Sequence, residues 1–197
     1  MIELPPGVVP NAMQPALIDF GGVQRPSSGA AALRLNRPGN RYRCAFSIPP
    51  TQMNGHGRVI VSRLIRAKSE GLRLPFELTG VSQGSPGQPV VDGAGQAGMT
   101  LSVRGLTPHY TAREGYWMSV VTAGQHYLHN IAGNVSAGDS GRAALPLSEM
   151  LRTPFPDGAT IHLGKPMIEG LVVGDEQVWS ISLAHHLSIE FEIEEAT

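Results

Sequence analysis

Glycine and proline interrupt this chain along its whole length and limit the secondary structure that it can form. The 197 residues include 24 glycines and 16 prolines, about a fifth of the chain, against about 12% in an average protein. Both residues are costly inside helices, which argues against long helices and coiled coils. Because 41% of the residues are hydrophobic, the chain can still fill a core and is not expected to be disordered. The composition therefore predicts a globular, mainly β protein with many turns.

Charge and cysteine content narrow the function classes. The chain has 15 basic and 16 acidic residues, for a formal charge of −1. We therefore expect no direct nucleic-acid sequence recognition. No apolar run approaches the length of a spanning helix, so we expect no membrane insertion. The single Cys44 leaves no intramolecular disulfide or thiolate zinc cluster, and Met1–Pro6 lacks signal-peptide features, so we expect synthesis in a reducing cytosol.

The first part of the chain combines a proline-rich segment, a strand and a helix. Residues 1–30 predict an extended N-terminal arm with a short strand at Ala16–Phe20, which lies over its own domain or reaches a neighbour. In Arg41–Ile48 alternate residues are apolar, which predicts a half-buried strand that Pro49-Pro50 ends; Ala32–Asn36 is its expected hairpin partner. The apolar face of that strand comprises Tyr42, Cys44, Phe46 and Ile48.

Helical spacing occurs once, at Gly57–Glu70. Ile60, Leu64 and Ala67 form its apolar stripe, and Gly71 suits its C-terminal end. A strand is expected next, at Leu72–Leu78. Proline at position 75 would favour an edge position for that strand.

A loop over Ser82–Gly98 introduces a second unit of short strands, Met99–Leu163. The expected strands are separated by turn residues, a pattern typical of a small barrel or sandwich; they are Thr100–Val103, Tyr116–Val121, His126–Ile131, Arg142–Leu145 and Thr160–Leu163. One helical turn is expected at Leu147–Leu151.

The last segment has the most regular pattern in the chain. From Trp179 to Ile193 apolar residues alternate with polar and then acidic ones, which predicts one long strand or two consecutive strands. A closing strand that returns to the first unit would make the second unit an insertion.

Candidate reactive residues do not form a recognisable catalytic or metal-binding pattern. His126 and His129 are three apart on an expected strand, and His185 and His186 are adjacent on another, so each pair should diverge. Asp92–Gly95 and Asp139–Gly141 lack the alternating acidic ligands of calcium loops and are interpreted as turns. Cys44 is expected to be a buried structural thiol.

Trp117 and Tyr116 are expected to be core aromatics, with a sugar-stacking platform as the alternative; Trp179 has the same two interpretations. The acidic run Glu190–Glu194 is expected to be a solvated strand face, an edge that resists pairing, or a contact for a basic neighbour. No catalytic, cofactor-binding or metal residue is predicted, which favours a binding or structural module over an enzyme.

The order of these features resembles the distal tail and minor tail proteins of long-tailed, siphovirus-type bacteriophages. In the first unit the similar residues are Asp19–Gly22, Gln24-Arg25, Gly29, Tyr42–Ile48, Pro49-Pro50, Gly57–Glu70 and Leu72–Leu78. In the second unit they are Gly115–Val120, His126–Leu128, Asp139–Ala143, Pro146-Leu147, Leu151-Arg152 and Gly158. The return strands of the pattern correspond to Pro166–Gly170 and Trp179–Glu195.

The resemblance implies a split β-barrel with one packed helix and an inserted small β-barrel domain. The barrel would comprise residues 31–81 and 166–197, with the helix near 57–70, and the insertion residues 82–165. The implied function is a structural virion protein, a homo-oligomeric, hexameric ring of the distal tail, made in the host bacterial cytoplasm. Its partners would be the tail tube protein and the tail-tip hub or tape-measure protein. The N-terminal arm and the Ser82–Gly98 loop are the expected inter-subunit contacts.

Two other functions stay open at this point. One is a carbohydrate-binding module at the tail tip, with Trp117 and Tyr116 on an exposed face. The other is a β-barrel enzyme whose site is assembled from scattered histidines and carboxylates.

Overall fold

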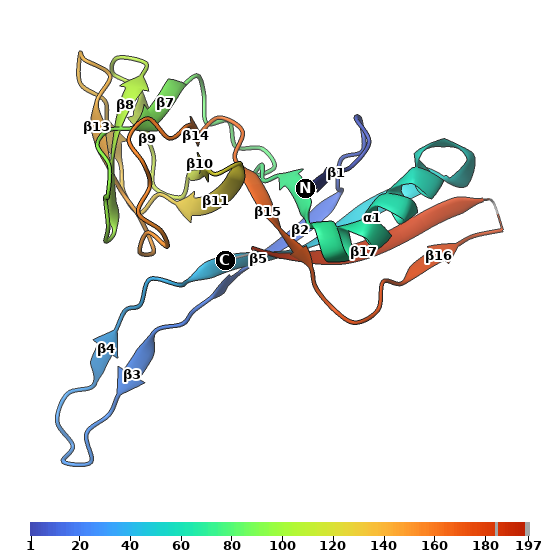
Figure 1. The fold of residues 1–197 in the computed structure, drawn as a ribbon, viewed down its shortest axis with the longest axis horizontal. Coiled ribbons are helices and arrows are strands. Elements are labelled where there is room, and N and C mark those ends of the chain that lie inside the picture. Colours follow the sequence, from blue (N-terminus) through green and yellow to red (C-terminus); the bar gives the residue numbers. More distant parts are fainter. Residues whose placement is uncertain (184, 196–197) are drawn as a thin grey trace. The chain divides into compact units, whose positions relative to one another are not determined.

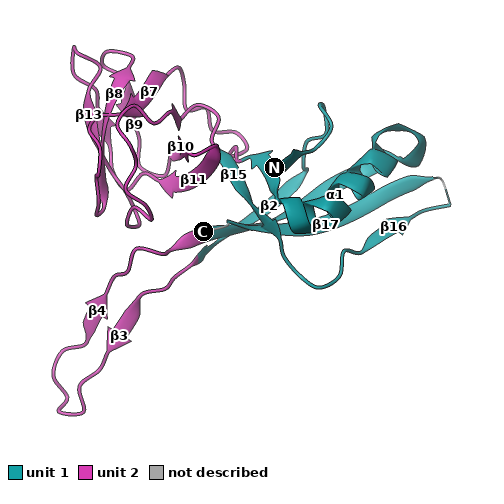
Figure 2. Cartoon of the chain, in the orientation of Figure 1, with its two compact units in different colours: residues 1–17, 42–75, 167–197 teal, residues 18–41, 76–166 magenta. Residues whose placement is uncertain are grey.

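The computed structural model describes residues 1–183 and 185–195. It is mainly β, with 45% of residues in strands and 9% in helical structure. Two compact units make up the chain (Figures 1 and 2): residues 1–17, 42–75 and 167–197 form unit 1, and residues 18–41 and 76–166 form unit 2. No helix in the described part of the chain is long and apolar enough to cross a membrane.

Unit 1 is built on a seven-stranded sheet in which the final strand is central. The strand order is β1-β6-β15-β17-β5-β2, and β16 pairs with β17 beside this path. The strands are β1 (Ile2–Glu3), β2 (Ala12–Ile18), β5 (Arg41–Gln52), β6 (Leu72–Pro75), β15 (Met167–Val172), β16 (Trp179–Ile181) and β17 (His186–Glu195).

Alternation places the apolar side chains of β5 and β17 in the core, as the sequence predicts. Tyr42, Cys44, Phe46 and Ile48 are at most 5% exposed, and so are Leu187, Ile189 and Ile193. Phe46 and Phe191 lie opposite each other in the register, with ring centroids 5.7 Å apart.

The predicted helix is confirmed as α1 (Arg58–Glu70), which follows a short π-helical turn, η1 (Met53–Gly57). Ile60, Leu64 and Ala67 are fully buried, and α1 packs on β1, β6 and β15. Gly71 ends the helix with φ 75°, a conformation that favours glycine, and its N–H donates to the carbonyl of Ala67.

Unit 2 contains a two-stranded hairpin at 22–35 and a small β domain at 76–166. The hairpin pairs β3 (Gly22–Gln24) with β4 (Leu33–Leu35). The domain has three sheets, β11-β10-β14, β13-β8-β7 and β12-β9. Their strands are β7 (Gly87–Val91), β8 (Thr100–Leu106), β9 (Thr111–Ala112), β10 (Trp117–Thr122), β11 (Gln125–Asn130), β12 (Val135–Ser136), β13 (Ala143–Pro146) and β14 (Ile161–His162).

Two isolated β-bridges link the sheet β11-β10-β14 to the sheet β13-β8-β7. Val90 pairs with Thr160, and Ile131 pairs with Leu147. The core between the sheets includes Met118, Val120, Leu145 and Phe155, all fully buried. Among the described residues, the strand pairings of neither unit close continuously into a barrel.

Five sequence-based expectations for local structure are wrong. Residues 1–30 are not one arm, because β1 pairs in parallel with β6, Ile2 and Leu4 are buried, and β2 belongs to the sheet. The partner expected at 32–36 pairs with β3 instead of β5. The loop expected at 82–98 contains β7, whose Val91 is fully buried. The segment 147–151 forms a bridge and a bend rather than a helical turn. His185 lies in a turn with φ 60° rather than on a strand.

Pro49-Pro50 does not end its strand, which is also contrary to expectation. The register between β5 and β17 shifts there, so that Ile48 faces Ile189 and Thr51 faces Leu187. A bulge of this kind leaves one residue without ladder hydrogen bonds, and it therefore tolerates residues that lack an N–H.

Gly170 is a test of the packing in unit 1. A Cβ atom at this position would lie 1.9 Å from the carbonyl oxygen of Glu194 on the neighbouring strand. We therefore expect Gly170→Ala to lower the free energy of unfolding by about 2 kcal/mol or more, measured by chemical denaturation. Gly22→Ala is the control, because nothing lies within 4 Å of its Cβ position. Equal stability of both variants would contradict the close approach.

The β10–β11 hairpin supplies a second test, because its two-residue turn contains Ala123 at φ 50° and Gly124 at φ 78°. A left-handed conformation costs an L-residue about 1 kcal/mol relative to glycine. Ala123→Gly should raise the melting temperature and Ala123→Val should lower it, since a β-branched side chain fits this conformation poorly. The opposite order in differential scanning calorimetry would refute this turn geometry.

Candidate functional site

The hairpin at residues 18–41, called the arm below, has no buried residue. Its strands β3 and β4 are joined through Pro26–Gly29, where the N–H of Gly29 donates to the carbonyl of Pro26. An isolated two-stranded hairpin is at best marginally stable in water. Packing among the arm's own side chains therefore does not explain its defined strand register.

A few polar contacts organise the base of the arm. Asp19 forms an ion pair with Arg34, and this guanidinium lowers the pKa of the Asp19 carboxyl. The N–H of Phe20 donates to Oδ1 of Asn40 at 2.8 Å. The guanidinium of Arg41 lies over the ring of Phe20, 4.9 Å from its centroid. These contacts hold the two chain segments together at the base of the arm.

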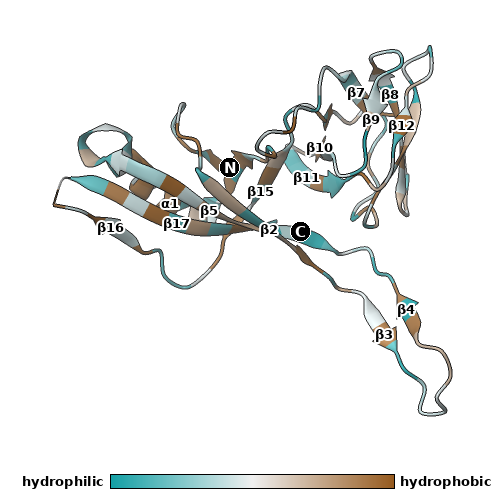
Figure 3. Ribbon diagram, turned by 180° about the vertical axis from the view of Figure 1, so that it is seen from behind, coloured by the Kyte–Doolittle hydropathy of each residue, from teal (hydrophilic) through white to brown (hydrophobic). Residues whose placement is uncertain are grey.

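The arm carries exposed apolar side chains beyond its base. Phe20, Val23 and Leu33 are 43%, 52% and 56% exposed, and Figure 3 shows hydrophobic residues recurring along the arm. The register places Val23 and Leu33 on opposite faces of the two-stranded ribbon, so each face presents an exposed apolar side chain that a partner could cover.

A second exposed apolar surface lies on unit 1, along residues 178–183. All six of these residues are exposed, and four of them are apolar: Val178, Trp179, Ile181 and Leu183. The register places Trp179 opposite Ile189 and Ile181 opposite Leu187. Trp179 and Ile181 thus share the apolar face that the alternation predicts, but they are not buried, because β16 lies at an edge of the sheet.

Beside β16 lies a groove of about 410 Å³. It crosses the paired strands β5, β17 and β16, and its lining also includes one residue near the start of unit 1: Asn11, Ser47, Ile48, Pro50, Val178, Trp179, Ser180, Ser188, Ile189 and Glu190. In the described part of the chain, β16 pairs on one side with β17 and has no strand on its other side. Its outer backbone groups are therefore available to another strand.

The acidic run differs from a fully solvated strand face. Glu190 is exposed, but Glu192 forms an ion pair with Arg43 at 3.0 Å. Glu195 is 1% exposed and accepts a hydrogen bond from the N–H of Tyr42 at 2.7 Å. The carboxylate of Glu195, the residue that follows the run, therefore belongs to the interior of unit 1.

The histidines of β11 have partners within unit 2. Nδ1 of His129 lies 2.7 Å from Oε1 of Glu149, and both side chains are at most 1% exposed. Nδ1 of His126 lies 3.2 Å from Oγ of Ser119. No sequence pattern points to Glu149 as a partner of His129, and the segment that carries Glu149 is predicted to form a helical turn. A pair shielded from solvent in this way contributes to the core and offers no access to a substrate.

The turns with acidic residues are held by arginine. Arg104 contacts Oδ1 of Asp92 at 3.0 Å and both carboxylate oxygens of Asp157, and the N–H of Gly93 donates to Asp157 at 2.8 Å. Asp139 is 94% exposed and lies 3.3 Å from His109.

Among the described residues, no group of three or more His, Cys, Asp or Glu side chains is placed to hold a metal ion.

Cys44, Tyr116 and Trp117 have structural roles in the fold. Cys44 is fully buried, and this burial raises the pKa of its thiol to about 12, which keeps the sulfur protonated. The ring of Trp117 lies 4.7 Å from that of Phe76, and the hydroxyl of Tyr116 donates to the carbonyl of Ser82. The Gln83 side chain bonds both backbone polar groups of Trp117, in the manner of a neighbouring strand.

A hollow of about 330 Å³ in unit 2 is lined in part by Trp117, Phe76 and Lys165. Its polar wall includes Gln83, whose side-chain amide donates to the carbonyl of Trp117, and Ser82, whose carbonyl accepts from the hydroxyl of Tyr116.

A scan against protein-family models gave no match, and a search of curated proteins gave no significant similarity.

The Arg104–Asp157 contact makes unit 2 sensitive to acid. Arg104 lowers the pKa of Asp157 from its usual 3.8 to about 2, so the ionised form is favoured in the folded state. This contribution is present above about pH 4 and is lost as the pH falls towards 2. We expect the urea midpoint, followed by Trp117 fluorescence in a Trp179→Phe background, to fall over this range. In Asp157→Asn the fall should be smaller; an equal fall would refute the assignment.

Proposed function

We propose that this chain is a structural, non-enzymatic subunit of a bacteriophage tail, which assembles into a ring at the distal tail between the tail tube and the tip hub. The residue pattern that resembles distal tail proteins suggests this class, with six-fold symmetry and a virion location. The finer architecture, a split β-barrel with a packed helix and an inserted small barrel, is part of the same proposal.

The observation that carries the proposal is the arm. None of its 24 residues, 18–41, is buried, yet it carries exposed apolar side chains and a defined strand register. A segment of this kind becomes ordered when a partner covers it. In a homo-oligomer the partner is a second copy, and a contact between two different surfaces repeats around a ring when the rotation closes.

The open sheet of unit 1 supports the same proposal. The segment 178–183, which contains the edge strand β16, is exposed throughout and includes four apolar residues. Proteins normally protect such an edge from pairing with other chains. An exposed apolar edge is therefore expected in a subunit whose edge strand becomes covered when the ring assembles. The tail tube protein and the hub or tape-measure protein are the other partners that this function implies.

The carbohydrate-binding alternative receives less support. Trp117 packs on Phe76, and the hydroxyl of Tyr116 already donates to Ser82. The two residues are partly buried rather than arranged on an open face.

Self-association tests the proposal directly. We expect size exclusion with light scattering to show oligomers whose fraction rises with concentration, and negative-stain electron microscopy to show rings. A protein that stays monomeric across the whole concentration range, or that forms oligomers without ring closure, would contradict the proposal.

Removal of the arm supplies the matched variant. Residues 19–40 are replaced by Asn-Gly, which forms a tight turn between strands, because β2 and β5 are neighbours in the sheet. The variant should keep the circular dichroism spectrum of the intact protein and lose oligomers at least about tenfold at equal concentration. Unchanged assembly with an intact fold would exclude the arm as an inter-subunit contact.

A further inference from the structure

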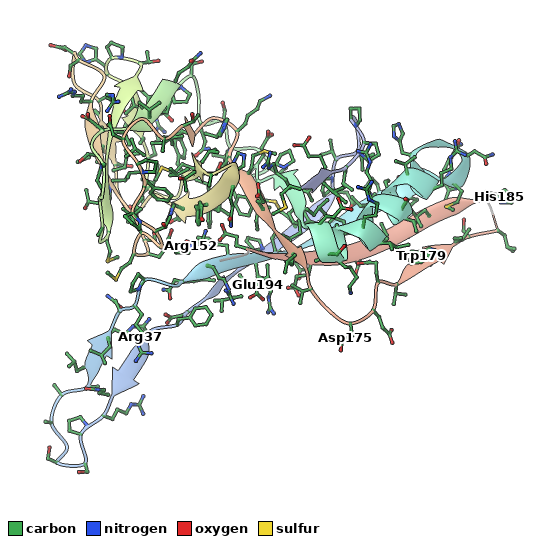
Figure 4. The ribbon with its side chains drawn as sticks, viewed as in Figure 1. Arg37, Arg152, Asp175, Trp179, His185 and Glu194 are labelled. Carbon is green, nitrogen blue, oxygen red and sulfur yellow. The ribbon has the colours of Figure 1, made fainter. Side chains whose placement is uncertain are left out.

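Charge differs sharply between the two exposed apolar surfaces. The arm has four arginines and one acidic residue, Asp19, whereas residues 174–195 have six acidic residues and no lysine or arginine. On the arm, Arg25 and Arg37 are exposed; beside β16, the exposed carboxylates are those of Asp175, Glu176 and Glu190. Figure 4 labels Arg37 on the arm and Asp175 and Trp179 near β16. Opposite charges around apolar centres are typical of surfaces that recognise each other.

Both surfaces also offer unpaired strand edges. Among the described residues, β4 pairs with β3 on one side and β16 pairs with β17 on one side. A strand added to such an edge gains main-chain hydrogen bonds, and side chains in neighbouring grooves determine the specificity. The groove of about 410 Å³ crosses the paired strands β5, β17 and β16 rather than the free edge, so a strand added at that edge would contact the exposed side chains of Trp179 and Ile181 on β16 itself.

We propose that β4 of the arm of one copy pairs along β16 of a second copy. Leu33 packs against the apolar stretch 178–183, and Arg25 and Arg37 face Asp175, Glu176 and Glu190. The contact joins two different surfaces, so each copy offers one arm and one β16 edge and the contact can propagate around a ring. This inference rests on the proposed function, since both require self-association, but it adds a defined pairing.

Mixed disulfide cross-linking tests the pairing. In a Cys44→Ala background, which removes the single native cysteine, one copy carries Leu33→Cys and a size-tagged copy carries Ile181→Cys. Both side chains are exposed in the single chain, at 56% and 54%. Under mild oxidation, we expect mixed dimers in yields at least about tenfold above those of a control pair, Leu33→Cys with Ser140→Cys. Ser140 is exposed in a turn of unit 2.

Charge exchange gives a second, independent readout. Arg37→Glu and Glu190→Lys should each weaken association about fivefold in light scattering, and the mixture of the two variants should recover most of the loss. The control Arg113→Glu changes an exposed arginine of unit 2 and should leave association unchanged. Raising the salt concentration from about 0.05 M to about 0.5 M should weaken association of the native protein. It should leave unchanged the association between the two charge-deleted variants, Arg37→Gln and Glu190→Gln.

The outcomes separate the inference from the proposed function. Rings with no Leu33–Ile181 cross-link overturn the inference and leave the function standing. Cross-linked, open chains of subunits support the inference and overturn the ring. Cross-linking of Ile181→Cys with itself shows that two β16 edges pair with each other, and cross-links that require added tail tube protein show another partner; both overturn the inference. A strictly monomeric protein overturns both.

Discussion

Strand β17 is the constraint on which unit 1 depends. It pairs with β15, β16 and β5, and its buried residues Leu187, Ile189, Phe191 and Ile193 form the inner face of the sheet. Because β5 and β17 are far apart in the sequence, their pairing carries a loop-closure cost, which must be offset by the packing of their buried side chains, including Phe46 against Phe191. Unit 1 therefore cannot complete its core until the last residues of the chain are in place.

The sequence predicted well those features that depend on local pattern. Alternation identified β5 and β17 together with their buried faces, and helical spacing with Gly71 as a stop identified α1. These signals are strong because one face of each element is buried over several consecutive residues.

The sequence predicts less well which strands pair with each other, because strand pairing depends on tertiary contacts. The segment at 33–35 has no sequence feature that prefers β3 to β5, and Pro49-Pro50 is compatible with a strand once a bulge is present. Similarly, β7 is hidden among glycines and prolines and is recognisable by the burial of Val91. Glu149 became a candidate partner only when the fold brought it to His129.

Topology gives the insertion a further consequence. Strands β6 and β15 are antiparallel neighbours, with Pro75 facing Met167 at the point where the chain leaves and re-enters unit 1. Within the sheet of unit 1, β6 and β15 therefore form a β-hairpin whose loop is the whole segment 76–166. In the same way, the arm is the loop that connects the neighbouring strands β2 and β5. Loops of hairpins can be exchanged, lengthened or lost during evolution while every ladder of the sheet persists. Changes in the inserted domain or in the arm can therefore leave the strand pairings of unit 1 intact.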